Sequence, residues 1–336
     1  MNNDFDYKQL GERWFAGDGP ALAKEVVARL AGGHGLTDLP LNTVAGRVDL
    51  RGLMLPSPHI VGQRSYTFKL PNGLEIDKSW AVLDGLIELK EVTLEGLNLA
   101  YAYLPHLRLI KCHIQDCIFD AANCADWRMW GCSVVDSSFK GSDLTELNVG
   151  AHYQGEPNRL SGDDFSHANL AGSGLWGVAA VTDCDFSFAT LTGINFFQAS
   201  LIGCRFAGSL REIIFDGRIL RPEQKSEPNP MRDIDMTRVT SFENVDFRGV
   251  RFDDVALPHI PGIVVVRSGP WIERALDSIA NRSDLPARIV KGRLSNMIKF
   301  NLPHESDCFI NLARMDEGRI LMEELLSVYV PAPNET

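Results

Sequence analysis

An apolar or neutral side chain occupies every fifth residue from Leu89 to Val149, thirteen times without interruption. The series is Leu89, Leu94, Leu99, Leu104, Leu109, Ile114, Phe119, Cys124, Met129, Val134, Phe139, Leu144 and Val149. A second residue, usually small or apolar, stands two positions before each of these. A helix repeats every 3.6 residues and a strand every 2, so neither sustains a period of five. The chain must therefore return to one interior wall after every five residues.

The five-residue pattern resumes after a short interruption at 151–157. Its later members are Leu160, Phe165, Leu170, Leu175 and Ala180, then Phe186, Leu191, Phe196, Leu201 and Phe206, and last Phe242, Phe247, Phe252 and Leu257. One extra residue, which we place near Asp183, shifts the frame between the first two groups. The pattern predicts a long repeat structure with a continuous interior.

Three segments show the repeat unit most clearly: 168–172 (ANLAG), 189–193 (ATLTG) and 245–249 (VDFRG). They resemble the A-(D/N)-L-x-x unit of the pentapeptide-repeat family. The resemblance implies an all-β solenoid, a right-handed quadrilateral β-helix in which four units form a coil of about 20 residues. It also implies that the central residue of each unit and the one two before it point inward.

Three regions follow from this pattern: a helical N-terminal extension at 1–47, the β-helix at 48–257 and a helical C-terminal region at 258–336. The β-helix carries a hairpin-like insertion at 61–86, because Pro71-Asn72-Gly73 separates two strand-forming runs. It also contains the short loop at 151–157 and a proline-rich long loop at 209–239.

The C-terminal region has helical spacing at Trp271–Ile279 and Ile289–Phe300, with a third helix or a broken pair around Gly318 between Ser306 and Val330. An open coil end exposes unpaired backbone groups, so we expect this region to cover it. It is also where we expect a homodimer contact.

Charge and hydropathy limit the function classes. The net charge is −11, and the repeats at 87–257 hold 24 Asp+Glu against 15 Lys+Arg. A basic surface for nucleic acid is therefore not expected. The sequence has no apolar run long enough to span a membrane and no signal-peptide pattern at its start, which predicts a cytoplasmic protein without a membrane segment.

Candidate chemistry is sparse. The sequence has no recognisable catalytic motif, and the eight histidines are scattered. Six of the seven cysteines fall on inward repeat positions, where cysteine packs as a small apolar residue. We therefore predict no catalytic site, no metal, no cofactor and no enzyme activity. An enzyme or effector module within 258–336 remains the open alternative.

Acidic residues 20 apart fall on one face of neighbouring coils. Asp116 and Asp136 stack in this way, and Asp126 and Glu146 stack on the opposite face. These carboxylates are candidate partner-binding residues. The alternative is that they only discourage lateral aggregation.

Outward apolar residues form a second candidate surface. Ile110 and Trp130 stack in the first block, and Trp176 with Phe197 and Val181 with Ile202 stack in the second. Exposed apolar surface in a soluble protein marks a contact. The alternative is that the terminal helices or the hairpin cover it. Glu223, Lys225 and Glu227 in the long loop complete the candidate set.

These observations predict a non-catalytic protein that presents an acidic β-helix and its loops to a protein partner. The sharper alternative comes from the resemblance, because some pentapeptide-repeat proteins mimic DNA and bind type II topoisomerases. It would make this chain a DNA-mimicking modulator or protector of DNA gyrase. The 15 basic residues among the repeats dilute the negative potential that such mimicry needs.

Overall fold

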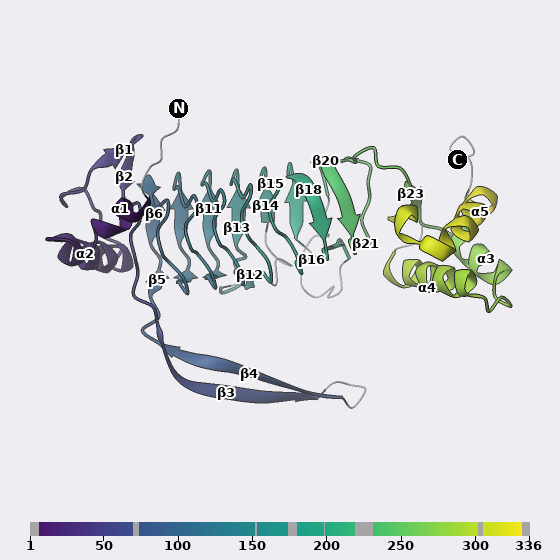
Figure 1. Ribbon diagram of the computed structural model, residues 1–336, viewed down its shortest axis with the longest axis horizontal. Helices are drawn as coiled ribbons and strands as arrows, with labels where there is room; N and C mark the ends of the chain where they lie inside the picture. Colours follow the sequence, from purple (N-terminus) through teal and green to yellow (C-terminus); the bar gives the residue numbers. More distant parts are fainter. Residues whose placement is uncertain are drawn as a thin grey trace.

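The computed structural model describes residues 7–69, 74–151, 153–173, 180–197, 199–218, 231–301 and 305–330. Stacked coils of short parallel strands form an elongated body, with helices at both ends and a two-stranded hairpin that projects from the first coils (Figure 1). The strand-rich, parallel character predicted from the repeats is therefore confirmed.

Strands of successive coils align into parallel ladders. The first ladder contains β5 (Glu88–Lys90), β8 (Arg108–Ile110), β10 (Arg128–Trp130) and β12 (Asn148–Ala151). Farther along the body, β16 (Asn195–Phe197), β19 (Ile214–Asp216) and β21 (Asp246–Arg248) form a separate three-stranded ladder. The second contains β6 (Thr93–Glu95), β9 (His113–Gln115), β11 (Ser133–Val135), β13 (Arg159–Ser161), β14 (Ala180–Thr182) and β17 (Ser200–Ile202). The third contains β1 (Thr43–Val44), β2 (Arg47–Asp49) and β7 (Leu97–Asn98) and, after single bridges, β15 (Asp185–Ser187), β18 (Arg205–Arg211), β20 (Ile234–Glu243) and β22 (Val255–Ala256). Single bridges from Met54 through Tyr103, Asn123, Asp143 and Asn169 to Thr190 form the fourth.

Coil length follows from the pairing register. Met129 pairs with Leu109, 20 residues earlier, as four five-residue units per coil require. Val134 pairs with Leu160, 26 residues later, because the interruption near 151–157 lengthens that coil. Insertions therefore leave the stacking of the coils intact.

The predicted frame shift near Asp183 is misplaced. Leu160 pairs with Val181, which is completely buried, whereas Ala180 is half-buried. The extra residue therefore lies before Val181. The sequence could not separate these positions, because Ala180 and Val181 are both apolar and adjacent.

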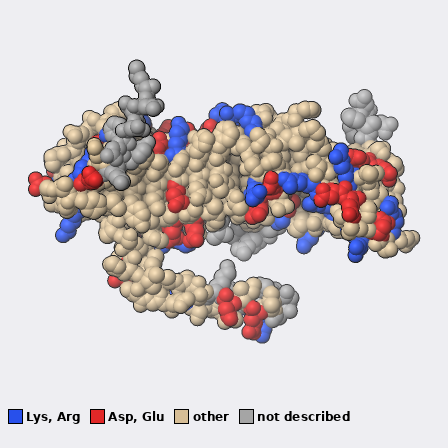
Figure 2. Space-filling model, in the orientation of Figure 1, with Lys and Arg blue, Asp and Glu red and all other residues tan. Residues whose placement is uncertain are grey.

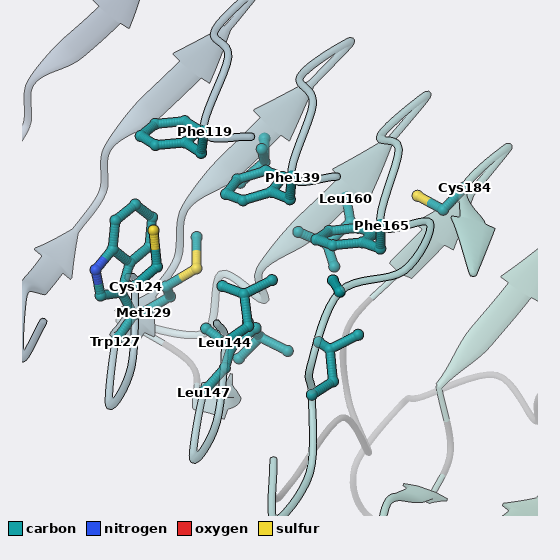
Figure 3. Close-up of a cluster of buried hydrophobic side chains, with 14 of the residues drawn as sticks. Phe119, Cys124, Trp127, Met129, Phe139, Leu144, Leu147, Leu160, Phe165 and Cys184 are labelled. Atoms are coloured by element: carbon teal, nitrogen blue, oxygen red, sulfur yellow. The ribbon is translucent and has the colours of Figure 1, made fainter. Parts of the chain in front are cut away.

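Aromatic rings stack along the interior of the coils. Phe119, Phe139, Phe165, Phe186 and Phe206 form one column, with ring centroids 4.8, 5.1, 5.2 and 5.4 Å apart. Figure 3 shows the first three of these rings beside Trp127, whose Nε1 donates a hydrogen bond to the Leu104 carbonyl at 2.6 Å. These spacings match the distance between paired strands, so each coil places one ring on the next.

The corners of the coils have their own backbone signature. From Glu91 to Glu146, every fifth residue has a positive φ, and only three of those twelve corner residues are glycines: Gly96, Gly131 and Gly141. A positive φ turns the chain sharply, and Asp is among the non-glycine residues that tolerate it best. Asp116, Asp126 and Asp136, with φ of 51°, 54° and 49°, occupy such corners.

The N-terminal helices α1 (Tyr7–Glu12) and α2 (Gly19–Ala31) cover the first coil. Arg13 forms an ion pair with buried Asp49 at 2.9 Å, and Trp14 Nε1 donates to the Arg51 carbonyl at 2.9 Å. Burial opposes ionisation of Asp49, but hydrogen bonds from Arg51 and Arg13 hold its pKa well below the usual range.

The C-terminal region covers the last coil. It contains β23 (Ile263–Arg267), α3 (Trp271–Ser278), α4 (Leu285–Phe300), β24 (Asp307–Asn311), the 3₁₀ turns η2 (Leu312–Arg314) and η3 (Asp316–Gly318), and α5 (Arg319–Tyr329). Phe309 packs on Phe242 and Phe247, with ring centroids 5.1 and 4.8 Å apart. The prediction of helix throughout 306–330 was wrong at its start, because 307–311 pairs as a strand with β23.

The long interruption is shorter than predicted. Strand β19 and the first half of β20 lie within 209–239 and continue the ladders of the preceding coil. Their alternating apolar residues, such as Phe215 and Ile234, are buried.

Candidate protein-binding surface

The outward apolar pair of the first block lies where the repeats predict. Ile110 on β8 and Trp130 on β10 are direct neighbours in the ladder, and both are half-buried. Lys111 Nζ lies 5.3 Å from the centre of the Tyr153 ring, at the short interruption. A Cβ on Gly131 would come within 3.1 Å of Tyr153 Cβ, so this interruption packs beside the pair.

The second apolar block is not a continuous surface. Val181 was expected to point outward, but it is an interior residue between Leu160 and Leu201. The misplaced frame shift explains this error. Ile202 pairs instead with Thr182, and Phe197 is half-buried beside Asp216. Trp176 lies outside the described residues.

One acidic stack is engaged within the chain. Asp116 forms an ion pair with Arg47. The carboxylate of Asp136 lies against the next corner, because a Cβ on Gly162 would sit only 2.3 Å from Asp136 Oδ1. Both residues are exposed, yet each has a structural role at a corner.

The opposite acidic stack is partly neutralised. Asp126 is buried and lies 2.9 Å from His106 Nδ1, 3.0 Å from Arg108 and 2.7 Å from Arg128. Burial opposes its ionisation, but hydrogen bonds from His106 and Arg108 lower the pKa of Asp126. Glu146, like Asp136 in the other stack, is exposed and forms no ion pair within the described residues.

Glu223, Lys225 and Glu227 lie outside the described residues, as does the predicted turn at Pro71-Asn72-Gly73. Their assignment as candidate binding residues therefore stays a prediction.

The hairpin of β3 (His59–Lys69) and β4 (Glu75–Asp84), here called the arm, presents a different kind of surface. Its strands pair in antiparallel register, with Gly62 opposite Val82, Arg64 opposite Trp80 and Tyr66 opposite Lys78. Residues two apart on a strand, and residues directly opposite, share one face. The register therefore sorts the arm into two faces.

One face of the arm is apolar, and the other is polar. The apolar face holds Tyr66, Ile76, Trp80 and Val82, and the register places the basic positions Arg64 and Lys78 on the same face. The polar face holds Gln63, Ser65, Thr67, Lys69, Glu75, Asp77 and Ser79, with Ala81. Thr67 donates a hydrogen bond to Asp77 at 2.6 Å, and Lys69 lies 3.4 Å from Glu75. The arm is therefore an amphipathic ribbon.

The apolar face is open to solvent. Tyr66 is 57% exposed, Trp80 49% and Ile76 37%. Figures 1 and 2 show the two strands standing away from the coils, joined to them only at the base. On the side shown in Figure 2, the charged residues of the arm gather toward its tip. The terminal helices lie at the ends of the body, so neither they nor the coils cover the described strands (Figure 1).

Two cavities lie between the last coil and α4, with volumes of about 60 and about 250 Å³. Phe309, Met297 and exposed Arg293 line both. Among the described residues, no group of three or more His, Cys, Asp or Glu side chains is arranged to hold a metal ion. None of the described helices combines the length and apolar character needed to cross a membrane.

Comparisons with known proteins agree with the coil register. Residues 182–209 match the family model described as pentapeptide repeats (8 copies). Together with the 20-residue coils, this match identifies pentapeptide repeats in the chain. No curated protein matches it.

Several solved pentapeptide-repeat structures match parts of the chain. Trypsin-treated QnrB1, a plasmid-mediated fluoroquinolone resistance protein, is 18% identical with a TM-score of 0.28, covering 48% of this chain and 82% of that one. Rfr23 from the cyanobacterium Cyanothece 51142 is 17% identical with a TM-score of 0.23, covering 38% and 91%. A protein from the Arabidopsis thaliana thylakoid lumen is 21% identical with a TM-score of 0.15, covering 49% and 68%. At these scores the likeness carries no argument about function.

The sequence prediction missed the apolar face of the arm. It identified the hairpin but did not sort its residues by strand period. The signal was present, because Ile76, Trp80 and Val82 are separated by even numbers of residues on one strand. The repeat pattern drew attention to outward positions on the coils instead.

Proposed function

We propose that this chain is a non-catalytic protein-binding protein, a right-handed quadrilateral β-helix that holds the arm out as a docking element. The observation that carries the proposal is the open apolar face of the arm, where Tyr66 and Trp80 are about half exposed. Large exposed aromatic residues in contiguous apolar surface mark protein contacts and dominate their energetics.

The arm lacks an evident role in holding the body together. Its two strands pack on each other, and its base approaches the coils through Ser57 and Tyr103, whose hydroxyl oxygens lie 3.5 Å apart. An isolated two-stranded hairpin is at best marginally stable in water. A partner that covers the apolar face would supply packing that the described residues of this chain do not.

The DNA-mimicking alternative has less support from the charge distribution. Mimicry needs regular free negative potential along the rod. Asp116 pairs with Arg47, and three cationic or titratable side chains surround Asp126. A gyrase partner therefore stays a prediction.

Capture of the tagged full-length chain from native lysate, followed by titration of each enriched protein in purified form, tests the proposal. Trp80→Ser should weaken binding of the partner at least tenfold, because a buried aromatic anchor contributes about 2 kcal/mol or more. Gln63→Ser, on the polar face, is the matched control and should bind normally. Equal binding by both variants, for every partner including the chain itself, would contradict the proposal.

A further inference from the structure

We propose that the apolar face of the arm packs on the same face of a second copy of this chain, forming a symmetric dimer. This inference rests on the proposed function, since it names the partner that the arm binds. Four properties of the arm favour a second copy: its net charge, its pattern of paired residues, its shape and its distance from the body.

The arm is electrically neutral, whereas the coils are not. Residues 59–84 contain three basic and three acidic side chains, while the repeats at 87–257 carry a net charge of −9. Like-charged surfaces repel at short range, which opposes contact between the coils of two copies. The arm as a whole has no net charge, so two copies meet there with less repulsion than between their coils, although the basic positions Arg64 and Lys78 share its apolar face.

The register makes the apolar face self-complementary. Arg64 on β3 lies directly opposite Trp80 on β4. A two-fold axis that runs along the arm, between the two apolar faces, places β3 of one copy over β4 of its partner. Arg64 of each copy then lies over Trp80 of the partner subunit. A guanidinium over an indole ring is a favourable cation–π pair, strongest where water is excluded. One symmetry operation therefore gives both arginines an aromatic partner.

The flat shape of the arm also suits packing between copies. Two paired strands facing two others form a four-stranded sandwich, with the sheets about 10 Å apart. Four strands around an apolar layer overcome the marginal stability of one hairpin. The polar face, with its Thr67–Asp77 hydrogen bond and its Lys69–Glu75 ion pair, remains in water.

The arm's position permits this contact. The two strands stand clear of the coils and are joined to them at the base (Figures 1 and 2). Ten residues of strand span roughly 34 Å, and two strands are roughly 10 Å wide. Such a face is smaller than the roughly 800 Å² per partner of a standard stable interface. We therefore expect a reversible dimer that forms over a measurable concentration range.

Sedimentation equilibrium of the full-length chain over a concentration series tests this inference. We expect the average mass to rise from 37.2 kDa toward twice that value as concentration increases. Trp80→Ser and Tyr66→Ser should each raise the dissociation constant at least tenfold. Gln63→Ser on the polar face should leave it unchanged, and circular dichroism of each variant should confirm that the coils remain folded.

The outcomes separate this inference from the proposed function. A monomer at all concentrations, whose arm still binds another protein through Trp80, overturns the dimer but leaves the function standing. A dimer of equal strength in all variants places the contact elsewhere, for example in the C-terminal region, and also overturns the inference. A monomer whose arm variants change no contact with any protein overturns both.

Discussion

The interior of the coils and the arm use similar residues in opposite ways. In the coils, Phe119, Phe139 and Phe165 are nearly inaccessible and stack ring on ring. In the arm, Tyr66 and Trp80 also lie on paired strands, but about half of each side chain is in contact with solvent. The coil residues gain their burial from neighbouring coils, whereas the described strands of the arm pack only on each other.

This difference separates residues that stabilise the fold from residues available for contact. Each interior position of a coil has a neighbour above and below, so its loss leaves a cavity or an unsatisfied group. An exposed apolar residue on a two-stranded ribbon loses little when it is replaced. Substitutions of the same kind in the two regions should therefore have different effects on folding.

The largest effect is expected from a charge placed in the coil interior. Leu144→Asp should abolish cooperative folding, because Leu144 is 1% exposed and an unpaired buried carboxylate costs several kcal/mol. Ile76→Asp in the arm should change the free energy of unfolding by less than about 1 kcal/mol. Thermal melts followed by circular dichroism measure both. A normal melt for Leu144→Asp would contradict the packing of the coils.

Truncation of one ring in the aromatic column comes next. Phe139→Ala should lower the free energy of unfolding by about 3–5 kcal/mol, since the neighbouring rings at 4.8 and 5.1 Å cannot close the cavity. Trp80→Ala should cost less than about 1 kcal/mol in the monomer. Denaturant titrations at a concentration below that of association give both values. If Phe139→Ala and Trp80→Ala lowered the free energy of unfolding by similar amounts, the coil interior and the arm would not differ in packing.

A buried carboxyl group should make the stability of the coils depend on pH. Asp163 is 1% exposed, and its carboxylate accepts hydrogen bonds from the backbone amides of Ser137 and Ser161 at 2.9 and 3.1 Å. Burial raises the pKa of Asp163 to about 7, well above its value in an unfolded chain. Folding therefore favours its protonated form. Its stabilising contribution is full below about pH 4 and is lost as the pH rises through 7.

Denaturation at pH 5 and pH 8 measures this effect. Relative to Asp163→Asn, which carries no charge at either pH, the wild-type chain should lose about 3 kcal/mol between those values. The arm carries no buried carboxylate among its described residues, so Asp77→Asn should leave the pH dependence unchanged. Parallel pH profiles for wild type and Asp163→Asn would exclude the buried carboxyl group as the cause.

The smallest effect concerns the corners. Ala121 has a φ of 53° and is exposed, so Ala121→Gly should raise the free energy of unfolding by about 1 kcal/mol by relieving backbone strain. The adjacent Ala122 is buried and does not have a positive φ, so Ala122→Gly should lower it by about 1 kcal/mol. Denaturant titrations of both variants and the wild-type chain show whether each substitution raises or lowers the free energy of unfolding. Two changes of the same sign would mean that corner strain does not limit the stability.

The five-residue pattern predicted most of the interior but not its polar members. Asn158 and Asp163 are buried two positions before Leu160 and Phe165, where the repeat rule itself places an inward residue. The apolar periodicity alone does not mark them, because both side chains are polar. Hydrogen bonds from backbone groups and from Asn158 to the Met129 carbonyl at 2.9 Å make their burial tolerable.

The candidate surface was harder to predict than the fold. The stacks of Asp116 with Asp136 and of Asp126 with Glu146 were recognised, but corner geometry and cationic partners depend on residues far away in the sequence, such as Arg47. Val181 was misassigned by one residue, and one residue is enough to exchange the inside for the outside. The arm could be located from its two strand-forming runs, but its distance from the body could not.

Hydrogen–deuterium exchange of the full-length chain at low and high protein concentration tests the central claim most directly, because it compares the coils and the arm in one sample. The account predicts slow exchange in coil peptides such as 113–135 at every concentration. Peptides covering 59–69 and 75–84 should exchange rapidly in dilute samples and become protected as copies associate. An arm that is equally protected at all concentrations, or that stays unprotected when the chain is dimeric, would contradict the account.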